Sequence, residues 1–194
     1  MQQTQDRYTA AMQTPPCTLP RFFACFALLL AAFFSFGCDN QRIAELEEGV
    51  STEADVRAKF GEPEAIWDAP TGVVSPGTTP GTRVFEYNRQ PEGHKNYQLS
   101  IGPDGKLSAL RQLLTPENFA KVAVGMPMES VRKMLGKPAE IKRYDLANET
   151  HMNWRFMEAG THTSKIFSAV LNSDLKVLRT EIGVDMKSPD YKGG

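Results

Sequence analysis

The stretch Val131-Arg132-Lys133-Met134-Leu135-Gly136-Lys137-Pro138 decides the fold, because a second version of it stands 75 residues earlier as Val56-Arg57-Ala58-Lys59-Phe60-Gly61-Glu62-Pro63. In each copy two apolar residues lie four apart, and this spacing places them on one face of a helix. The glycine is typical of a helix end in a left-handed conformation, and the proline two residues later prevents continuation. The sequence therefore contains two short helices with the same sharp end.

Each copy begins in the same way. Gly49 precedes the first copy and Gly125 the second. Thr52 followed by Asp55 is a suitable helix start. The repeat signature is structural and consists of eight residues: Gly49, Val56, Gly61, Pro63, Gly125, Val131, Gly136 and Pro138.

A further short helix is expected before each copy. The first covers residues 40–48, and the second covers residues 116–122, with Thr115 as its cap and Pro116 in its first turn. Phe119 and Val122 are expected to face inward. Each repeat therefore starts with two helices.

The pattern changes to strands after each helix end. We expect strands at 64–67, 83–88, 95–101 and 106–113, and again at 140–144, 150–156, 165–171 and 175–182. Tyr97, Leu99 and Ile101 alternate with Gln98 and Ser100, which predicts one buried and one wet sheet face. The fold class is α+β, with two tandem helix-helix-antiparallel-sheet repeats and the helices on one face of the sheet.

These elements divide the chain into four parts. Residues 1–37 are predicted as a lipoprotein signal peptide, 38–114 as the first repeat, 115–186 as the second and 187–194 as a flexible tail. A Pro/Gly-rich insert at 68–82 has no counterpart in the second repeat. It is expected to be either a surface loop or an arm that reaches a partner.

An uncharged apolar run covers residues 22–37, with Arg21 before it and Cys38 after Gly37. This order is that of a secretory leader cut between Gly37 and Cys38. A cysteine at the cut predicts lipid attachment to Cys38. The alternatives are an ordinary cleaved leader and a retained anchor, although 16 residues fall short of the roughly 20 that span a bilayer.

Composition after such cleavage narrows the functional class. The remaining 157 residues hold 20 basic and 22 acidic side chains, a net charge of −2. No basic run supports nucleic-acid binding. Cys17 and Cys25 leave with the leader, so the folded part has no thiol for a disulfide or a cysteine-based metal site.

No motif predicts catalysis, a cofactor, a metal or a small-molecule substrate. His94, His151 and His162 have no metal-ligand spacing and are expected to be satisfied or exposed loop residues. The acidic run Glu45, Glu47 and Glu48 is expected on a short helix, as a solvated face or a docking surface for a basic partner. We therefore expect no enzyme.

Aromatic residues are expected to lie in the strands and mostly in the core. If several share an open sheet face, they would form a protein-binding patch, because aromatics dominate binding hot spots. The set is Trp67, Phe85, Tyr87, Tyr97, Tyr144, Trp154, Phe156 and Phe167.

The repeat signature, together with the leader, resembles that of the SmpA/OmlA lipoproteins, the family that includes BamE. The second copy matches through Gly125-Met126, Val131 and residues 135–138, and the first through Gly49, Val56 and residues 60–63. The family fold is two helices on a three-stranded antiparallel sheet. A tandem version is similar to the β-lactamase inhibitor protein, whose two repeats form one continuous sheet, whereas BamE itself has one copy.

The resemblance implies an accessory subunit that supports outer-membrane β-barrel assembly by binding protein partners, held by membrane lipid through an acylated Cys38. The expected location is the periplasmic face of the outer membrane. Asp39, directly after the lipid cysteine, favours the inner membrane instead. The rival hypothesis is an inhibitor or regulator of a periplasmic enzyme that uses a concave tandem sheet. A third is a structural tether at the inner membrane.

Overall fold

The computed structural model describes residues 39–68, 79–189 and 191. The chain divides into two compact units, residues 1–41 and residues 42–194. The predicted leader, the Gly37–Cys38 cleavage site, most of the 68–82 insert and part of the 187–194 tail lie outside the described residues.

The first repeat begins with two helices, α2 (Asp39–Ala44) and α3 (Glu53–Phe60). Thr52 caps α3: its hydroxyl accepts a hydrogen bond from the backbone N–H of Asp55, whose carboxylate accepts one from the N–H of Thr52. This reciprocal pair satisfies two donors that a helix start leaves open. The expected start of α3 is therefore confirmed.

Four strands follow and form an antiparallel sheet in chain order. They are β1 (Ala65–Asp68), β2 (Arg83–Asn88), β3 (Asn96–Ile101) and β4 (Leu107–Gln112). The turn at residues 102–105 joins β3 to β4, as its Gly-Pro-Asp-Gly sequence predicts.

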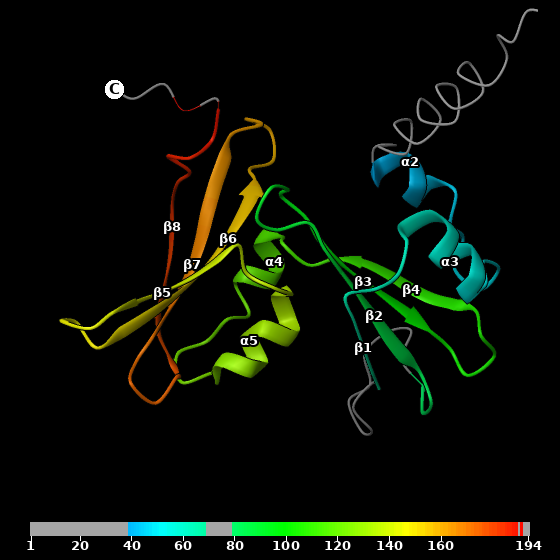
Figure 1. Cartoon of the computed structure of the whole chain (residues 1–194), viewed down its shortest axis with the longest axis horizontal. Helices are drawn as coiled ribbons and strands as arrows, with labels where there is room; N and C mark the ends of the chain where they lie inside the picture. Colours follow the sequence, from blue (N-terminus) through cyan, green and yellow to red (C-terminus); the bar gives the residue numbers. More distant parts are fainter. Residues whose placement is uncertain (1–38, 69–78, 190, 192–194) are drawn as a thin grey trace, which may run out of the picture. The chain divides into compact units, whose positions relative to one another are not determined.

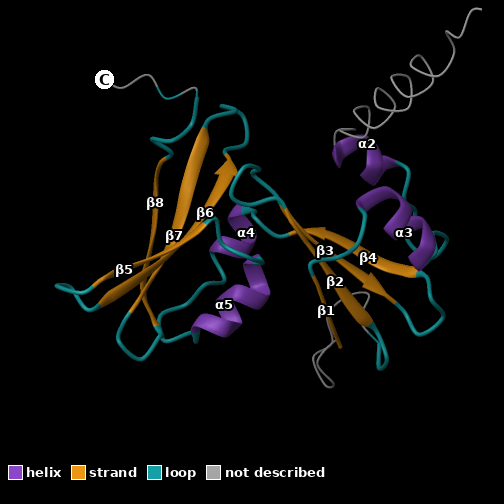
Figure 2. Ribbon diagram, viewed as in Figure 1, coloured by secondary structure: helices purple, strands orange, loops and turns teal. Residues whose placement is uncertain are grey.

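The second repeat has the same order. Helices α4 (Pro116–Phe119) and α5 (Met128–Leu135) precede β5 (Glu140–Tyr144), β6 (Glu149–Met157), β7 (Ser164–Leu171) and β8 (Val177–Val184). Its four strands form a second antiparallel sheet, also in chain order. Figure 1 and Figure 2 show α4 and α5 on one face of this sheet. The predicted α+β fold with two repeats is confirmed.

Three expected boundaries are wrong. The helix expected at residues 116–122 is α4, which ends at Phe119. The first helix ends at Ala44, so Glu45, Glu47 and Glu48 lie in the turns that follow it rather than on a helix. Leu175 has a φ of 56°, which belongs to a turn, and β8 therefore begins two residues later than expected. Local turn geometry explains the later start of β8, because a strand cannot start at a left-handed residue.

The two helix ends differ from the expected left-handed form. Gly61 has φ 83° and ψ −163°, and Gly136 has φ 77° and ψ −171°. This combination of positive φ and extended ψ is open essentially to glycine alone. It turns the chain directly into the extended segment that contains Pro63 or Pro138, so the glycine is required more strictly than a helix cap would demand.

Each repeat has its own apolar core. Val56 and Phe60 from α3 pack against the first sheet, and Val131 and Leu135 from α5 pack against the second. Phe119 and Val122 face inward, as expected. Six of the eight strand aromatics are buried, whereas Trp67 is partly buried and Tyr144 is 40% exposed. The expectation that most of them are core residues is confirmed.

The first sheet does not have the expected wet face: Ser100 is 6% exposed, and Gln98 is only partly exposed. Glu86, Asn88, Asn96 and Ser100 lie on the side opposite the α3 core, yet each is at most 6% exposed. The cause lies in the tertiary structure, because α5 of the second repeat covers this side of the first sheet.

Candidate functional surfaces

The polar face of the first sheet binds the end of α5. Asn96 Nδ2 donates to the carbonyl oxygens of Leu135 and Lys137, both at 2.9 Å. Asn88 Oδ1 accepts from the N–H of Lys137 at 2.9 Å, and Gln98 donates to the carbonyl of Lys133 at 2.7 Å. These side chains satisfy the backbone groups that a helix end leaves without partners.

A buried ion pair adds to this contact. Both carboxylate oxygens of Glu86 accept from the Arg132 guanidinium, at 2.6 and 3.2 Å, and the Glu86 side chain is only 3% exposed. The two-pronged geometry suits a guanidinium and a carboxylate. A Cβ on Gly136 would lie 2.6 Å from Asn88 Oδ1, so the second glycine is also needed for close approach.

A second contact joins the repeats at the loop between β2 and β3. Gln90 Nε2 donates to the carbonyl of Arg155 at 2.8 Å, and Gln90 Oε1 accepts from the N–H of Arg155 at 3.1 Å. Arg155 also donates to the carbonyl of Pro91 at 2.9 Å. The Gln90 side-chain amide therefore bonds both backbone groups of Arg155, as a residue of a neighbouring strand would.

Beside this contact, a histidine, a serine and an aspartate lie together. His94 Nε2 is 2.8 Å from Ser164 Oγ, and Ser164 Oγ donates to Asp185 at 2.7 Å. A catalytic triad needs the carboxylate to orient the histidine, whereas here Asp185 accepts from the serine and from Arg155 at 2.6 Å. Asp185 is fully buried and Ser164 nearly so, hence the cluster is a structural network and not a nucleophile site.

The environment of this network shifts two pKa values. Burial, together with the charge of Arg155, lowers the pKa of His94, which favours the neutral ring. Burial acts to raise the pKa of Asp185, but the hydrogen bonds from Ser164 and Arg155 outweigh it, so that its pKa is lowered. The surroundings therefore favour the neutral form of His94 and the ionised form of Asp185.

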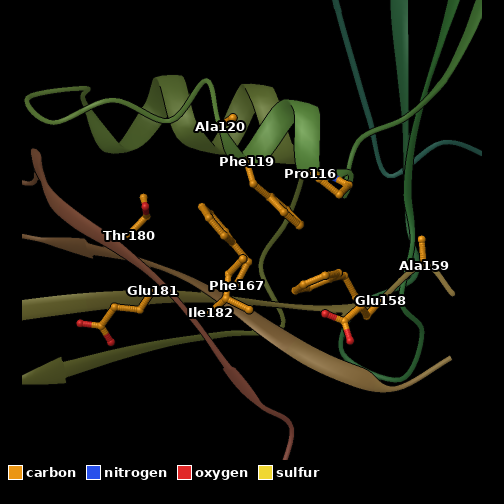
Figure 3. A pocket seen from close by; sticks show the side chains of 10 residues that line it. Pro116, Phe119, Ala120, Glu158, Ala159, Phe167, Thr180, Glu181 and Ile182 are labelled. Atoms are coloured by element: carbon orange, nitrogen blue, oxygen red, sulfur yellow. The ribbon is translucent and has the colours of Figure 1, made fainter. Parts of the chain in front are cut away.

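An open groove of about 620 Å³ lies between α4 and the second sheet (Figure 3). Phe119 stacks on Phe167 at 4.2 Å between ring centroids, and Phe156 meets Phe119 edge-on at 4.8 Å. Ile182, 59% exposed, forms the β8 side. The groove is therefore apolar and aromatic, with Glu158 and Glu181 also among its lining residues.

The other face of the second sheet carries a polar and aromatic patch. The Tyr144 and His151 rings lie 4.6 Å apart, and Arg179 donates to both carboxylate oxygens of Glu149 at 2.6 and 3.1 Å. Hydrogen bonds from Arg179 and His151 lower the pKa of Glu149 to about 2. Lys142 lies over the Tyr144 ring at 4.9 Å. We call Lys142, Tyr144, Glu149, His151 and Arg179 the outer patch.

The predicted site residues fall in separate places. His94 is a bonded loop residue, His151 lies on β6 rather than in a loop, and His162 is exposed. Among the described residues, no three His, Cys, Asp or Glu side chains are grouped so that they could hold a metal ion. Cys38 lies outside the described residues, and within those that are described no helix is long and apolar enough to cross a membrane.

The acidic run has structural partners. Glu48 Oε1 accepts from the backbone N–H of Leu110 at 2.8 Å, and Glu45 pairs with Lys59. All three carboxylates are at the surface. The docking role expected as one alternative stays a prediction.

Sequence reasoning missed the contacts between the repeats. Asn88 and Lys137 are 49 residues apart, and Gln90 and Arg155 are 65 apart. Asparagine and glutamine at alternate strand positions are typical of a sheet face that contacts water. These residue types therefore did not indicate that a helix covers this face. The groove is different, since the inward positions of Phe119, Phe156 and Phe167 were all expected.

Comparisons with known proteins found similarity to solved structures alone. No family model matches the chain, and no curated protein matches it. Two solved structures are similar over most of the chain. A DUF4309 family protein from Bacillus subtilis is 20% identical, covers 73% of this chain and 83% of its own, and has a TM-score of 0.24. A putative beta-lactamase inhibitor protein from Streptococcus mutans is 10% identical, covers 68% and 82%, and has a TM-score of 0.27.

Proposed function

We propose that the protein is a lipid-anchored, non-catalytic binding module of the cell envelope that holds a protein partner in the groove between α4 and β8. The anchor is inferred from the leader pattern and Cys38. The observation that carries the binding role is the groove, whose floor consists of the buried Phe119, Phe156 and Phe167 rings and whose β8 side carries the exposed Ile182. An apolar groove with an exposed aliphatic side chain at its edge is the kind of surface that anchors a side chain of a protein partner.

The contacts between the repeats support this role. Gln90, Asn96 and the Glu86–Arg132 pair tie the second repeat to the first, so the groove belongs to a preorganised body. Preorganisation lowers the entropy that a partner must overcome on binding.

The partner that the repeat signature favours is a subunit of the outer-membrane β-barrel assembly machinery. The motivation is the doubled glycine–proline helix end behind a lipoprotein leader, which resembles the SmpA/OmlA pattern. The location proposed is the periplasmic face of the outer membrane, with the inner membrane as the alternative that Asp39 favours.

The groove can be tested without disturbing the core. Ala120 and Ala159 are exposed residues that line it, so Ala120→Arg and Ala159→Arg fill it from the rim. Ala147→Arg, in the exposed turn before β6, is the matched control. We expect crosslinking in membranes to recover barrel-assembly subunits with the original protein and with Ala147→Arg, and to lose them with both groove variants. Recovery unaffected by the groove variants contradicts the proposal.

The anchor has a separate test. Cys38→Ala is expected to move the protein from the membrane pellet to the soluble fraction, because acyl chains and not the polypeptide hold it there. Mass spectrometry of the wild-type N-terminus checks the modification directly. An unmodified N-terminus beyond the leader would overturn the lipid anchor while leaving the groove test valid.

A second candidate is an inhibitor or regulator of a periplasmic enzyme, and the outer patch is the observation in its favour. The patch combines the Tyr144 and His151 rings with charged groups, a mixture typical of binding surfaces. The two separate four-stranded sheets do not form the single continuous sheet that this hypothesis expected. Loss of inhibition of a periplasmic enzyme by Tyr144→Ala, with the groove variants unaffected, would favour this candidate.

A further inference from the structure

We propose that β8 pairs with β8 of a second copy of this chain, in antiparallel register centred on Thr180, to join the two second-repeat sheets into one. The inference rests on the edge of the second sheet, and Thr180, Glu181 and Ile182 of that edge also line the groove, so a second copy and a partner in the groove would share β8. Figure 1 shows β8 at the edge of its sheet. Edge strands present backbone N–H and C=O groups that can pair with another strand.

Comparison of the two repeats identifies the free edge. In the first, Gly49 N–H donates to the carbonyl of Leu107, and three residues beyond Leu107 the N–H of Leu110 is bound by the Glu48 carboxylate at 2.8 Å. In the second, Gly125 N–H donates in the same way to the carbonyl of Val177. The counterpart of Leu110 is therefore Thr180.

The counterpart of Glu48 is Val124, which is 75% exposed and whose side chain contains no hydrogen-bond acceptor. Within the described residues, no side chain replaces the Glu48 carboxylate beside Thr180. The first sheet thus has a blocked edge where the second has an open one. The Thr180 N–H points outward, as does that of Ile182 two residues on, because alternate residues of an edge strand face outward.

Charge and apolar character fix both the occupant and the register. With Thr180 opposite Thr180 of the second copy, Arg179 lies opposite Glu181 and Leu178 lies opposite Ile182. Arg179 and Glu181 are 45% and 49% exposed, and Leu178 and Ile182 are 42% and 59% exposed. Opposite charges and apolar pairs across neighbouring strands are stabilising. The edge strand is complementary to itself, as a two-fold interface requires.

Two other registers are less favourable. Centring on Glu181 places like charges opposite one another. Centring on Leu178 requires the place beside Val177 that residues 125–126 already occupy, since Met126 and Gly125 both bond to Val177. In the Thr180 register, the two threonines exchange both their N–H···O bonds, and pairing is limited to residues 178–182 of each copy, because Gly183 of the second copy would otherwise need the place beside Val177 that residues 125–126 occupy.

The test uses two single charge reversals and their mixture. Glu181→Lys leaves Arg179 facing Lys at both ends of the pairing, and Arg179→Glu leaves Glu facing Glu181. A one-to-one mixture of the two variants places opposite charges at both ends. Changes within each chain are the same alone and in the mixture, so folding effects cancel in the comparison.

We expect the full chain in mild detergent to sediment as a dimer at about 100 µM, since a Kd near 1 µM would then give almost full occupancy. Each single variant should dimerise with a Kd about tenfold higher, which a dilution series measures, and the mixture should recover the wild-type Kd as a dimer of one copy of each. Val124→Glu should also raise the Kd, because it supplies the cap that Glu48 provides in the first repeat.

Three results would overturn the inference. These are a monomeric wild-type chain at that concentration, a mixture no more associated than either variant alone, or a dimer that Val124→Glu leaves unchanged. The last result would assign the association to another surface, including the acyl chains or the leader. A chain that is monomeric but binds an unrelated extended peptide along β8 would likewise replace the second copy as occupant.

Discussion

The indole Nε1 of Trp154 donates a hydrogen bond of 3.1 Å to the carbonyl oxygen of Gly136, the glycine that ends α5. The first repeat contains the equivalent contact, in which the Tyr87 hydroxyl donates at 3.0 Å to the carbonyl of Gly61. An aromatic donor on the second strand of each sheet therefore holds the glycine that ends the helix above it. The repeat is a unit in which helix end and sheet are bonded directly.

Removal of either donor should destabilise its repeat. Tyr87→Phe deletes one hydroxyl and leaves the Gly61 carbonyl with one fewer partner, a cost of about 1–2 kcal/mol. Trp154→Phe should cost more, about 2–4 kcal/mol, because a fully buried ring is also made smaller. Urea unfolding measures both, with Tyr144→Phe at the surface as the control. Equal stability of Trp154→Phe and the wild type would contradict this account.

The two helix-ending glycines should respond differently to alanine. Both have the same strained backbone, worth about 1–3 kcal/mol for a residue with a side chain. A Cβ on Gly61 meets nothing within 4 Å, whereas a Cβ on Gly136 meets Asn88 and Asn96. Gly136→Ala should therefore be at least about 2 kcal/mol more destabilising than Gly61→Ala, measured by urea unfolding. Matching losses would show that close approach at Gly136 is unimportant.

Arg132 and Arg57 occupy the same place in the two copies but different environments. Arg132→Ala leaves the buried Glu86 carboxylate without its cation, which should cost about 3–5 kcal/mol. Arg57 pairs with Glu53 and Glu62 nearer the surface, so Arg57→Ala should cost about 1 kcal/mol or less. Adding Glu86→Gln to Arg132→Ala should recover much of the loss. An unchanged double variant would mean that an unpaired buried charge is not the cause.

His94 should make stability depend on pH. Burial lowers its folded pKa below the ordinary value of about 6.5, so the unfolded chain binds a proton first as pH falls. The contribution of His94 to the free energy of unfolding should have its full value above about pH 7 and should decline as the pH falls through 6.5. The lowered pKa values of Asp185 and Glu149 act on stability only below about pH 5.

Urea unfolding between pH 5 and about 8 measures this slope. His94→Gln should flatten it, and His162→Gln, at an exposed position, is the control for loss of a histidine. The groups that face His94 are Ser164, Arg155 and Asp185. A slope that survives His94→Gln would assign the pH dependence to other residues.

Much of the architecture could be predicted because it depends on local chemistry. Four-residue apolar spacing, a threonine cap and a glycine–proline end define α3 from its own residues. The strands follow from apolar runs bounded by turn residues: seven of the eight lie within one residue of the prediction at both ends, and β8 lies within two. The inward positions of the groove aromatics could also be predicted in this way, although their place at the floor of a groove could not.

The sequence by itself determined that this chain folds as two copies of one helix-and-sheet unit, because periodicity, capping and turn formation act between residues close together in the chain. Only the tertiary structure decided that α5 covers the far face of the first sheet, that Gln90 bonds to β6, and that β8 has an open edge where β4 has a capped one. These depend on groups as many as 65 residues apart. Such groups meet through packing and leave no periodic pattern in the chain.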